Sequence, residues 1–122
     1  MSTMRASVMP DFERQPTLAD IPMPEAKPGE VLMRVHAASI NGIDLSIASG
    51  QLQGMLEYHF PVVLGKDFAG TVEAVGTGVT GFAAGDRVFG VISDPSPLSS
   101  RSFAEYLAVP AGPNLTDRKS VV

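Results

Sequence analysis

The chain has 122 residues, a net charge of −4 and no cysteine. This length suits one domain, and the lack of cysteine excludes a disulfide framework and a thiolate metal site. The acidic balance and the absence of tryptophan argue against a nucleic-acid-binding surface. No apolar run reaches the length of about 18 residues that a membrane span needs, and the first residues lack the apolar core of a signal peptide. A cytoplasmic protein that binds neither membrane nor nucleic acid is therefore expected.

The first part of the chain predicts three strands. Residues 3–9 form the first, and residues 17–21 form a short second strand. The second strand precedes Pro22 and Pro24, and proline excludes a central place in a sheet because it cannot donate to the hydrogen-bond ladder. Residues 30–39 alternate between two faces, which predicts a central strand with one face in the core.

A short helix is predicted to follow this strand, over residues 44–49. Asn41 and the glycine after it form a common turn pair. Asp44 suits the cap or the first turn of a helix, and Gly50 suits the position just past its end. Residues 51–60 are expected to form a surface loop.

The middle of the chain, residues 61–90, reads as three strands separated by glycine turns. The apolar residues 62–64 form a short strand that ends at Gly65. Residues 68–75 follow with a period of two, which predicts a strand with one face of small side chains. After further glycines, residues 87–89 form the next strand.

The last part predicts an irregular loop over residues 93–100 and a final strand over residues 102–109. The domain is expected to comprise residues 1–111, and residues 112–122 to form a polar tail. No repeat and no internal domain boundary are evident.

One glycine pattern is predicted to be a turn although it matches a nucleotide-binding motif as text. Gly76, Gly78 and Gly81 have the G-x-G-x-x-G spacing. A dinucleotide site needs a helix directly after the glycines, whose N-terminus receives the pyrophosphate. The segment that follows is too short for such a helix and is interrupted by Gly85.

Two linked motifs carry a family resemblance: G-x-D-x-A-G-x-V-x-x-V-G from Gly65 and G-D-R-V-F-G from Gly85. Together they resemble the medium-chain dehydrogenase/reductase superfamily, and more closely its zinc-free quinone oxidoreductase branch. The similarity extends over nearly all of residues 3–111. It implies a mainly β fold, namely the N-terminal GroES-like domain, a partly open β-barrel with one or two short helices. The Rossmann domain that accompanies it in the family is absent from this chain.

The resemblance implies a catalytic role for Asn41. In zinc-free relatives the asparagine of the N-x-x-D motif lies beside the nicotinamide and the substrate carbonyl, where an amide can donate to a carbonyl or accept from a carboxamide. The substrate and cofactor cleft is expected to include Ser46, Gln51, Leu52, Met55 and Lys66. Structural roles are expected for Asp44, Gly65, Asp67 and Gly70. A turn role for Asn41 and a solvated charge pair at residues 66–67 are the plainer alternatives.

No zinc is expected. The zinc dehydrogenases carry cysteine where the motif alignment places Asn41, and histidine where it places Lys66. Neither an amide nor an ammonium group replaces thiolate or imidazole on zinc. Residues 93–100 also lack the four-cysteine lobe that holds structural zinc. The family often has tyrosine and arginine where this chain has Ser46 and Ala48, which leaves the identity of a quinone substrate open.

The resemblance implies one domain of an NADPH-dependent reductase that passes hydride to a quinone or an α,β-unsaturated carbonyl. The partner would be its own Rossmann domain, the full-length enzyme would be a homodimer, and this chain alone would be inactive. An enoyl reductase uses the same chemistry, and the residues do not separate the two. A stand-alone GroES-like binding or assembly module is the alternative from another class, because a fold alone does not determine a function.

Overall fold

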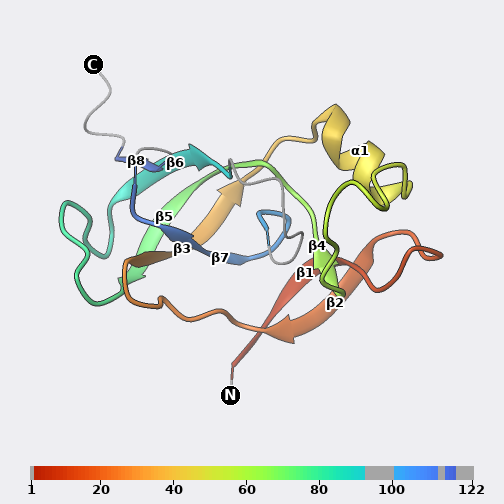
Figure 1. Ribbon diagram of the computed structural model, residues 1–122. Coiled ribbons are helices and arrows are strands. Elements are labelled where there is room, and N and C mark those ends of the chain that lie inside the picture. Colours follow the sequence, from red (N-terminus) through yellow and green to blue (C-terminus); the bar gives the residue numbers. More distant parts are fainter. Residues whose placement is uncertain (1, 93–100, 113–114, 118–122) are drawn as a thin grey trace.

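The computed structural model describes residues 2–92, 101–112 and 115–117 and shows a mainly β molecule with two antiparallel sheets and one helix (Figure 1). The three-stranded sheet has the order β2-β1-β4 and is built from β1 (Thr3–Met9), β2 (Thr17–Pro22) and β4 (Val62–Val63). The five-stranded sheet has the order β7-β3-β5-β6-β8 and is built from β3 (Glu30–Ala37), β5 (Asp67–Val75), β6 (Arg87–Val91), β7 (Tyr106–Pro110) and β8 (Leu115–Asp117). The helix α1 (Gly42–Ala48) leads away from the end of β3. Both sheets stay open, in agreement with the expected partly open barrel.

The main core lies against the five-stranded sheet. Its buried members share an inward position on alternating strand residues and are Val31, Met33, Phe68, Val72, Val88, Leu107, Val109 and Leu115. The strand β3 lies between β7 and β5, as its alternating pattern predicts. The alternation of β5 is also confirmed, since Phe68, Gly70 and Val72 are buried and Glu73 is exposed.

A second core cluster joins the helix to the three-stranded sheet. It consists of Met9, Ile47, Val62 and Leu64, and the half-buried Leu52 and Tyr58 pack against it. Ile47 is the buried member that α1 contributes, at 4% exposure, and Ala48 of the same helix packs against the cluster. The end of α1 is therefore held by the packing of Ile47 and Ala48 and by the loop that follows the helix.

The strand β8 is the main departure from the sequence-based expectation. Part of the predicted polar tail, residues 115–117, pairs with β6, and Leu115 is only 5% exposed. Three residues carry too little periodicity to predict a strand, and the exposed edge of β6 supplies the pairing that the local sequence does not encode. The predicted loop over residues 93–100 lies outside the described residues. In the described ranges, no helix is long and apolar enough to cross a membrane.

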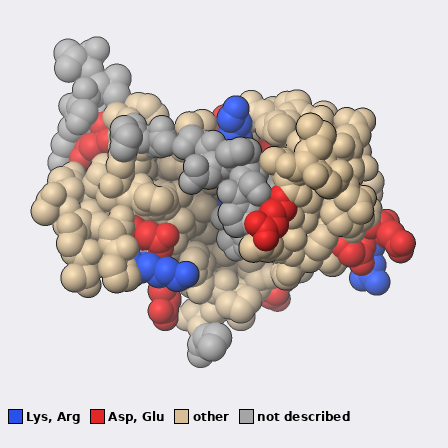
Figure 2. All heavy atoms as spheres, viewed as in Figure 1, with Lys and Arg blue, Asp and Glu red and all other residues tan. Residues whose placement is uncertain are grey.

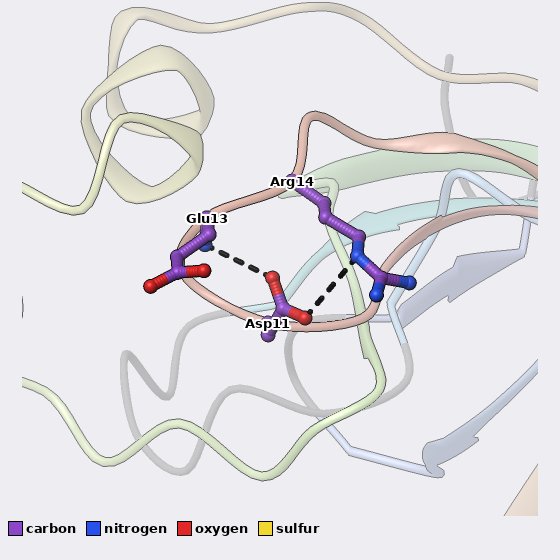
Figure 3. A network of polar contacts seen from close by, with 3 residues as sticks. All are labelled: Asp11, Glu13 and Arg14. Carbon is purple, nitrogen blue, oxygen red and sulfur yellow. Dashed lines mark hydrogen bonds and ion pairs between the residues drawn. The ribbon is translucent and has the colours of Figure 1, made fainter.

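Charged residues are scattered over the molecular surface seen in Figure 2, singly or in small groups. One such group lies in the turn between β1 and β2 (Figure 3). There the Asp11 carboxylate accepts a hydrogen bond from the Glu13 N–H at 3.0 Å and lies 3.5 Å from Nε of Arg14. Both members of this ion pair are well exposed, so it contributes little to stability.

Candidate functional site

Asn41 lies at the N-terminus of α1, where its backbone is extended with φ −114° and ψ 158°. The Asp44 carboxylate accepts a hydrogen bond from the Asn41 N–H at 2.8 Å, and the Asp44 N–H donates to the Asn41 carbonyl at 3.0 Å. Asp44 is buried, with 3% exposure. This carboxylate therefore fixes the backbone at the start of the helix and compensates an N–H group that the helix leaves without a partner.

Asp67 approaches Asn41 from the first residue of β5. Its carboxylate accepts a hydrogen bond from the Ser39 N–H at 2.7 Å, and its second oxygen lies 3.4 Å from Nδ2 of Asn41. The Ser39 carbonyl lies 3.4 Å from the same nitrogen. The pairing of β3 with β5 brings the end of one strand beside the start of the other, so residues far apart in sequence meet here.

Sequence reasoning missed this contact. A structural role was expected for Asp67, with a solvated charge pair as the plainer alternative, but neither its contact with Asn41 nor Ser39 was predicted. A backbone N–H has no sequence signature, so Ser39 could not have been found. The aspartate of the G-x-D motif was visible in the sequence, but only the strand pairing places it beside Asn41.

Gly65 has a backbone that other residues rarely adopt, with φ +124°. A Cβ atom added there would lie 2.9 Å from the Ser102 nitrogen and against its hydroxyl group. The glycine therefore allows the chain to pass close to the segment that leads into β7. Gly70 is constrained in a similar way, because an added Cβ would fall against the Arg34 carbonyl of β3. Lys66 is exposed, and its backbone carbonyl accepts a hydrogen bond from the Ile92 N–H at 2.6 Å.

The four other residues assigned to the cleft from sequence follow Asn41 along the chain. Ser46 is half-buried in α1, and its carbonyl accepts hydrogen bonds from the Ser49 hydroxyl and the Gln51 N–H at 2.9 and 3.2 Å. Leu52 packs against the second core cluster, whereas Gln51 is exposed and Met55 is 75% exposed. The structure thus leaves the side chains of Gln51 and Met55 accessible and uses Leu52 for packing.

Several apolar side chains are exposed in the segment from Ile40 to Met55, which includes α1. Ile40 and Met55 are each 75% exposed, Leu45 is 66% exposed and Ile43 is 41% exposed. Large apolar residues are usually exposed singly, and a group of them on one surface marks a site of contact with a ligand or another domain. The exposed apolar side chains next to Asn41 in the sequence are therefore available for contact with an apolar partner.

The residues around Asn41 do not fit a zinc site. No group of three or more histidine, cysteine, aspartate or glutamate side chains comes together within the described ranges. The carboxylates of Asp44 and Asp67 accept hydrogen bonds from backbone N–H groups. The two positions that the family resemblance aligns with zinc ligands hold an amide, Asn41, and an ammonium group, Lys66. The glycine pattern from Gly76 lies, as predicted, in a turn between β5 and β6, and no helix begins between these two strands.

Comparisons with known proteins agree with the resemblance in the motifs. The sequence model of the family described as the alcohol dehydrogenase GroES-like domain matches residues 27–115. The quinone oxidoreductase of Sus scrofa is 39% identical over 106 residues, which cover 87% of this chain and 30% of that protein. A trans-enoyl reductase of Macrophomina phaseolina is 40% identical over 105 residues, which cover 84% of this chain and 28% of the relative.

Among solved structures, an alcohol dehydrogenase superfamily protein from Novosphingobium aromaticivorans has a TM-score of 0.84 and 32% identity. The match covers 98% of this chain and 36% of that protein. The chain thus spans about a third of the length of the proteins that it matches. It belongs to the alcohol dehydrogenase GroES-like domain family and is an N-terminal-type domain of the medium-chain dehydrogenase/reductase superfamily.

Proposed function

We propose that this chain forms the substrate-side wall of the hydride-transfer cleft in a zinc-independent, NADPH-dependent reductase of the quinone oxidoreductase type. The observation that carries the proposal is Asn41 at the start of α1, where Asp44 accepts from the backbone N–H and Asp67 faces the side-chain amide, with exposed apolar residues next to it in the sequence. One polar group within an apolar surface is typical of a small-molecule site, and such sites often form between domains.

The cofactor would supply the hydride when bound, and this chain would position the acceptor. The Asn41 amide is the hydrogen-bonding group for the carboxamide of the cofactor or for the substrate. Ile40, Leu45 and Met55 offer apolar contacts that suit a quinone or an enone. The exposed Lys66 adds a positive charge that favours an anionic cofactor. No metal takes part, because the side chains at the two aligned ligand positions are not zinc ligands.

The cofactor is bound mainly by a Rossmann domain, which these residues do not include. Two observations support this division. The turn after β5 lacks the helix that would receive a pyrophosphate, and the chain covers only 30% of its quinone oxidoreductase relative. The chain alone is then inactive.

The test is turnover by a polypeptide that joins this domain to a Rossmann domain. We expect NADPH-dependent reduction of a quinone that continues in the presence of a zinc chelator. Asn41→Ala should lower kcat/KM by about tenfold to a hundredfold, since the loss of one positioned hydrogen bond in a catalytic site costs about 1.4–2.7 kcal/mol. Asp11→Asn is the control, because Asp11 lies 30 residues before Asn41, in the exposed turn between β1 and β2. Loss of turnover on chelation, or full activity of Asn41→Ala, would contradict the proposal.

An enoyl reductase is the second candidate, favoured by the 40% identity to a protein of that name. Both enzymes would use the same cleft, so the substrate decides between them. Parallel assays with a quinone and with an α,β-unsaturated thioester would identify the preferred acceptor. The alternative that is not an enzyme is an assembly module. Sedimentation distinguishes the two: a sevenfold ring would favour the assembly module, and a monomer or dimer would favour the enzyme domain.

A further inference from the structure

The two carboxylates beside Asn41 act on different parts of this residue. Asp44 accepts the hydrogen bond of the backbone N–H at 2.8 Å, whereas Asp67 faces the side-chain nitrogen Nδ2 at 3.4 Å. Asp67 is itself held in place by the Ser39 N–H at 2.7 Å. Asp44 thus determines the backbone of Asn41, and Asp67 is the group in a position to determine its side chain.

The chemistry of these neighbours fixes the direction of the Asn41 amide. Both groups that lie 3.4 Å from Nδ2, the Ser39 carbonyl and the Asp67 carboxylate, are hydrogen-bond acceptors. The opposite orientation would place the amide oxygen against two other oxygens with no proton between them. The NH₂ group must therefore face Asp67, and the oxygen lies on the other side, toward the start of α1.

We propose that Asp67 is a positioning residue that makes Asn41 a hydrogen-bond acceptor in the cleft. This inference rests on the proposed function for the identity of the cleft. With its NH₂ group engaged, Asn41 presents its oxygen, which has two lone pairs and so keeps one for a ligand even if the other faces the first turn of α1. The bound group is then a donor, such as a carboxamide NH₂ or the hydroxyl of a reduced quinone. Of the two roles open to the amide, donation to a substrate carbonyl is excluded.

The contact can be tested in this chain without a cofactor. The sequence has only five side-chain amides, at Gln15, Asn41, Gln51, Gln53 and Asn114. In a ¹H–¹⁵N correlation spectrum, the two side-chain NH₂ signals of Asn41 are identified by their loss in the Asn41→Ala variant. We expect its NH₂ protons to exchange about threefold to tenfold more slowly than those of the exposed Gln51 and Gln53, the protection that one ordinary hydrogen bond provides.

The variant Asp67→Asn should remove this protection. The oxygen of the new amide would satisfy the Ser39 N–H, and its NH₂ group would then face the NH₂ group of Asn41. Asp11→Asn is the matched control, because it makes the same substitution at a carboxylate that also accepts a backbone N–H, in the exposed turn of Figure 3. Rapid exchange of the Asn41 amide in the unaltered chain, or protection that survives in Asp67→Asn, would overturn the inference.

A stability measurement provides an independent test if Asp67→Asn perturbs the fold. Helix-cap preferences rank aspartate equal to asparagine and well above alanine. The Asp67 contact predicts the reverse order, with Asn41→Asp less stable than Asn41→Ala, because a second carboxylate would face Asp67 and the Ser39 carbonyl. In an Asp67→Asn background this extra penalty should disappear. If Asn41→Asp is as stable as the unaltered chain, Asp67 does not position Asn41. None of these measurements depends on turnover, so they can fail while the proposed function stands.

Discussion

At the scale of single residues, the site depends on groups whose roles are set by their neighbours. Asn41 was identified from its motif, and the structure adds the two carboxylates that hold it. The sequence could suggest that Asp44 caps the helix, because a cap is a local feature. It could not connect Asn41 to Asp67, because that contact depends on the pairing of two strands.

Gly65 provides a prediction that separates backbone strain from packing. Gly65→Ala should cost roughly 2–4 kcal/mol, because it adds a methyl group against Ser102 at a positive φ. Gly54→Ala is the control, since Gly54 also has a positive φ, +86°, but has open space around an added Cβ. It should cost only about 1–2 kcal/mol. Urea denaturation measures both values. Equal losses would show that the close approach to Ser102 does not contribute.

Tyr58 provides a prediction about alkaline pH. Burial raises the pKa of Tyr58 above its ordinary value of 10.0, and its hydroxyl donates to the Ile47 carbonyl at 3.0 Å. A raised pKa means that the folded state favours the neutral phenol. This contribution to stability is therefore complete below pH 10 and is lost as the pH rises through the folded-state pKa. Tyr58→Phe should flatten the fall in unfolding free energy above pH 10, measured by denaturant titration at several pH values. An unchanged slope would contradict this role of Tyr58.

At the scale of elements, the sequence predicted those strands whose pattern is long enough to read. The predicted bounds of β1 agree with the structure, and the period of two correctly predicted β3 as a central strand and the alternation of β5. The helix α1 was placed within two residues of its observed start. The strand β8 was missed because a pairing with the edge of β6 determines it, and its own three residues do not.

Leu115 tests whether β8 is part of the domain core. Leu115→Ala should cost about 2–4 kcal/mol, because this side chain is 5% exposed and packs in the main cluster. Leu18→Ala makes the same change at a position that is 70% exposed, on the edge strand β2, and should cost less than about 0.5 kcal/mol. Denaturation midpoints compare the two variants. Similar small losses would place β8 outside the cooperative core.

At the scale of the whole molecule, our proposal assigns these two open sheets and α1 to one domain of a longer enzyme. Apolar residues are exposed at the start of α1, where Asn41 precedes the helix. The chain spans about a third of its relatives, whose remaining length has room for the cofactor site. In our proposal the domain contributes the substrate-side wall and a hydrogen-bond acceptor, and the dinucleotide is held elsewhere.

Calorimetric titration of these 122 residues with NADPH tests this division of labour most directly. A control titration uses the polypeptide in which a Rossmann domain accompanies this domain. The account predicts micromolar binding by the longer polypeptide and no measurable heat of binding for this chain alone. Micromolar binding of NADPH by the isolated chain would contradict it.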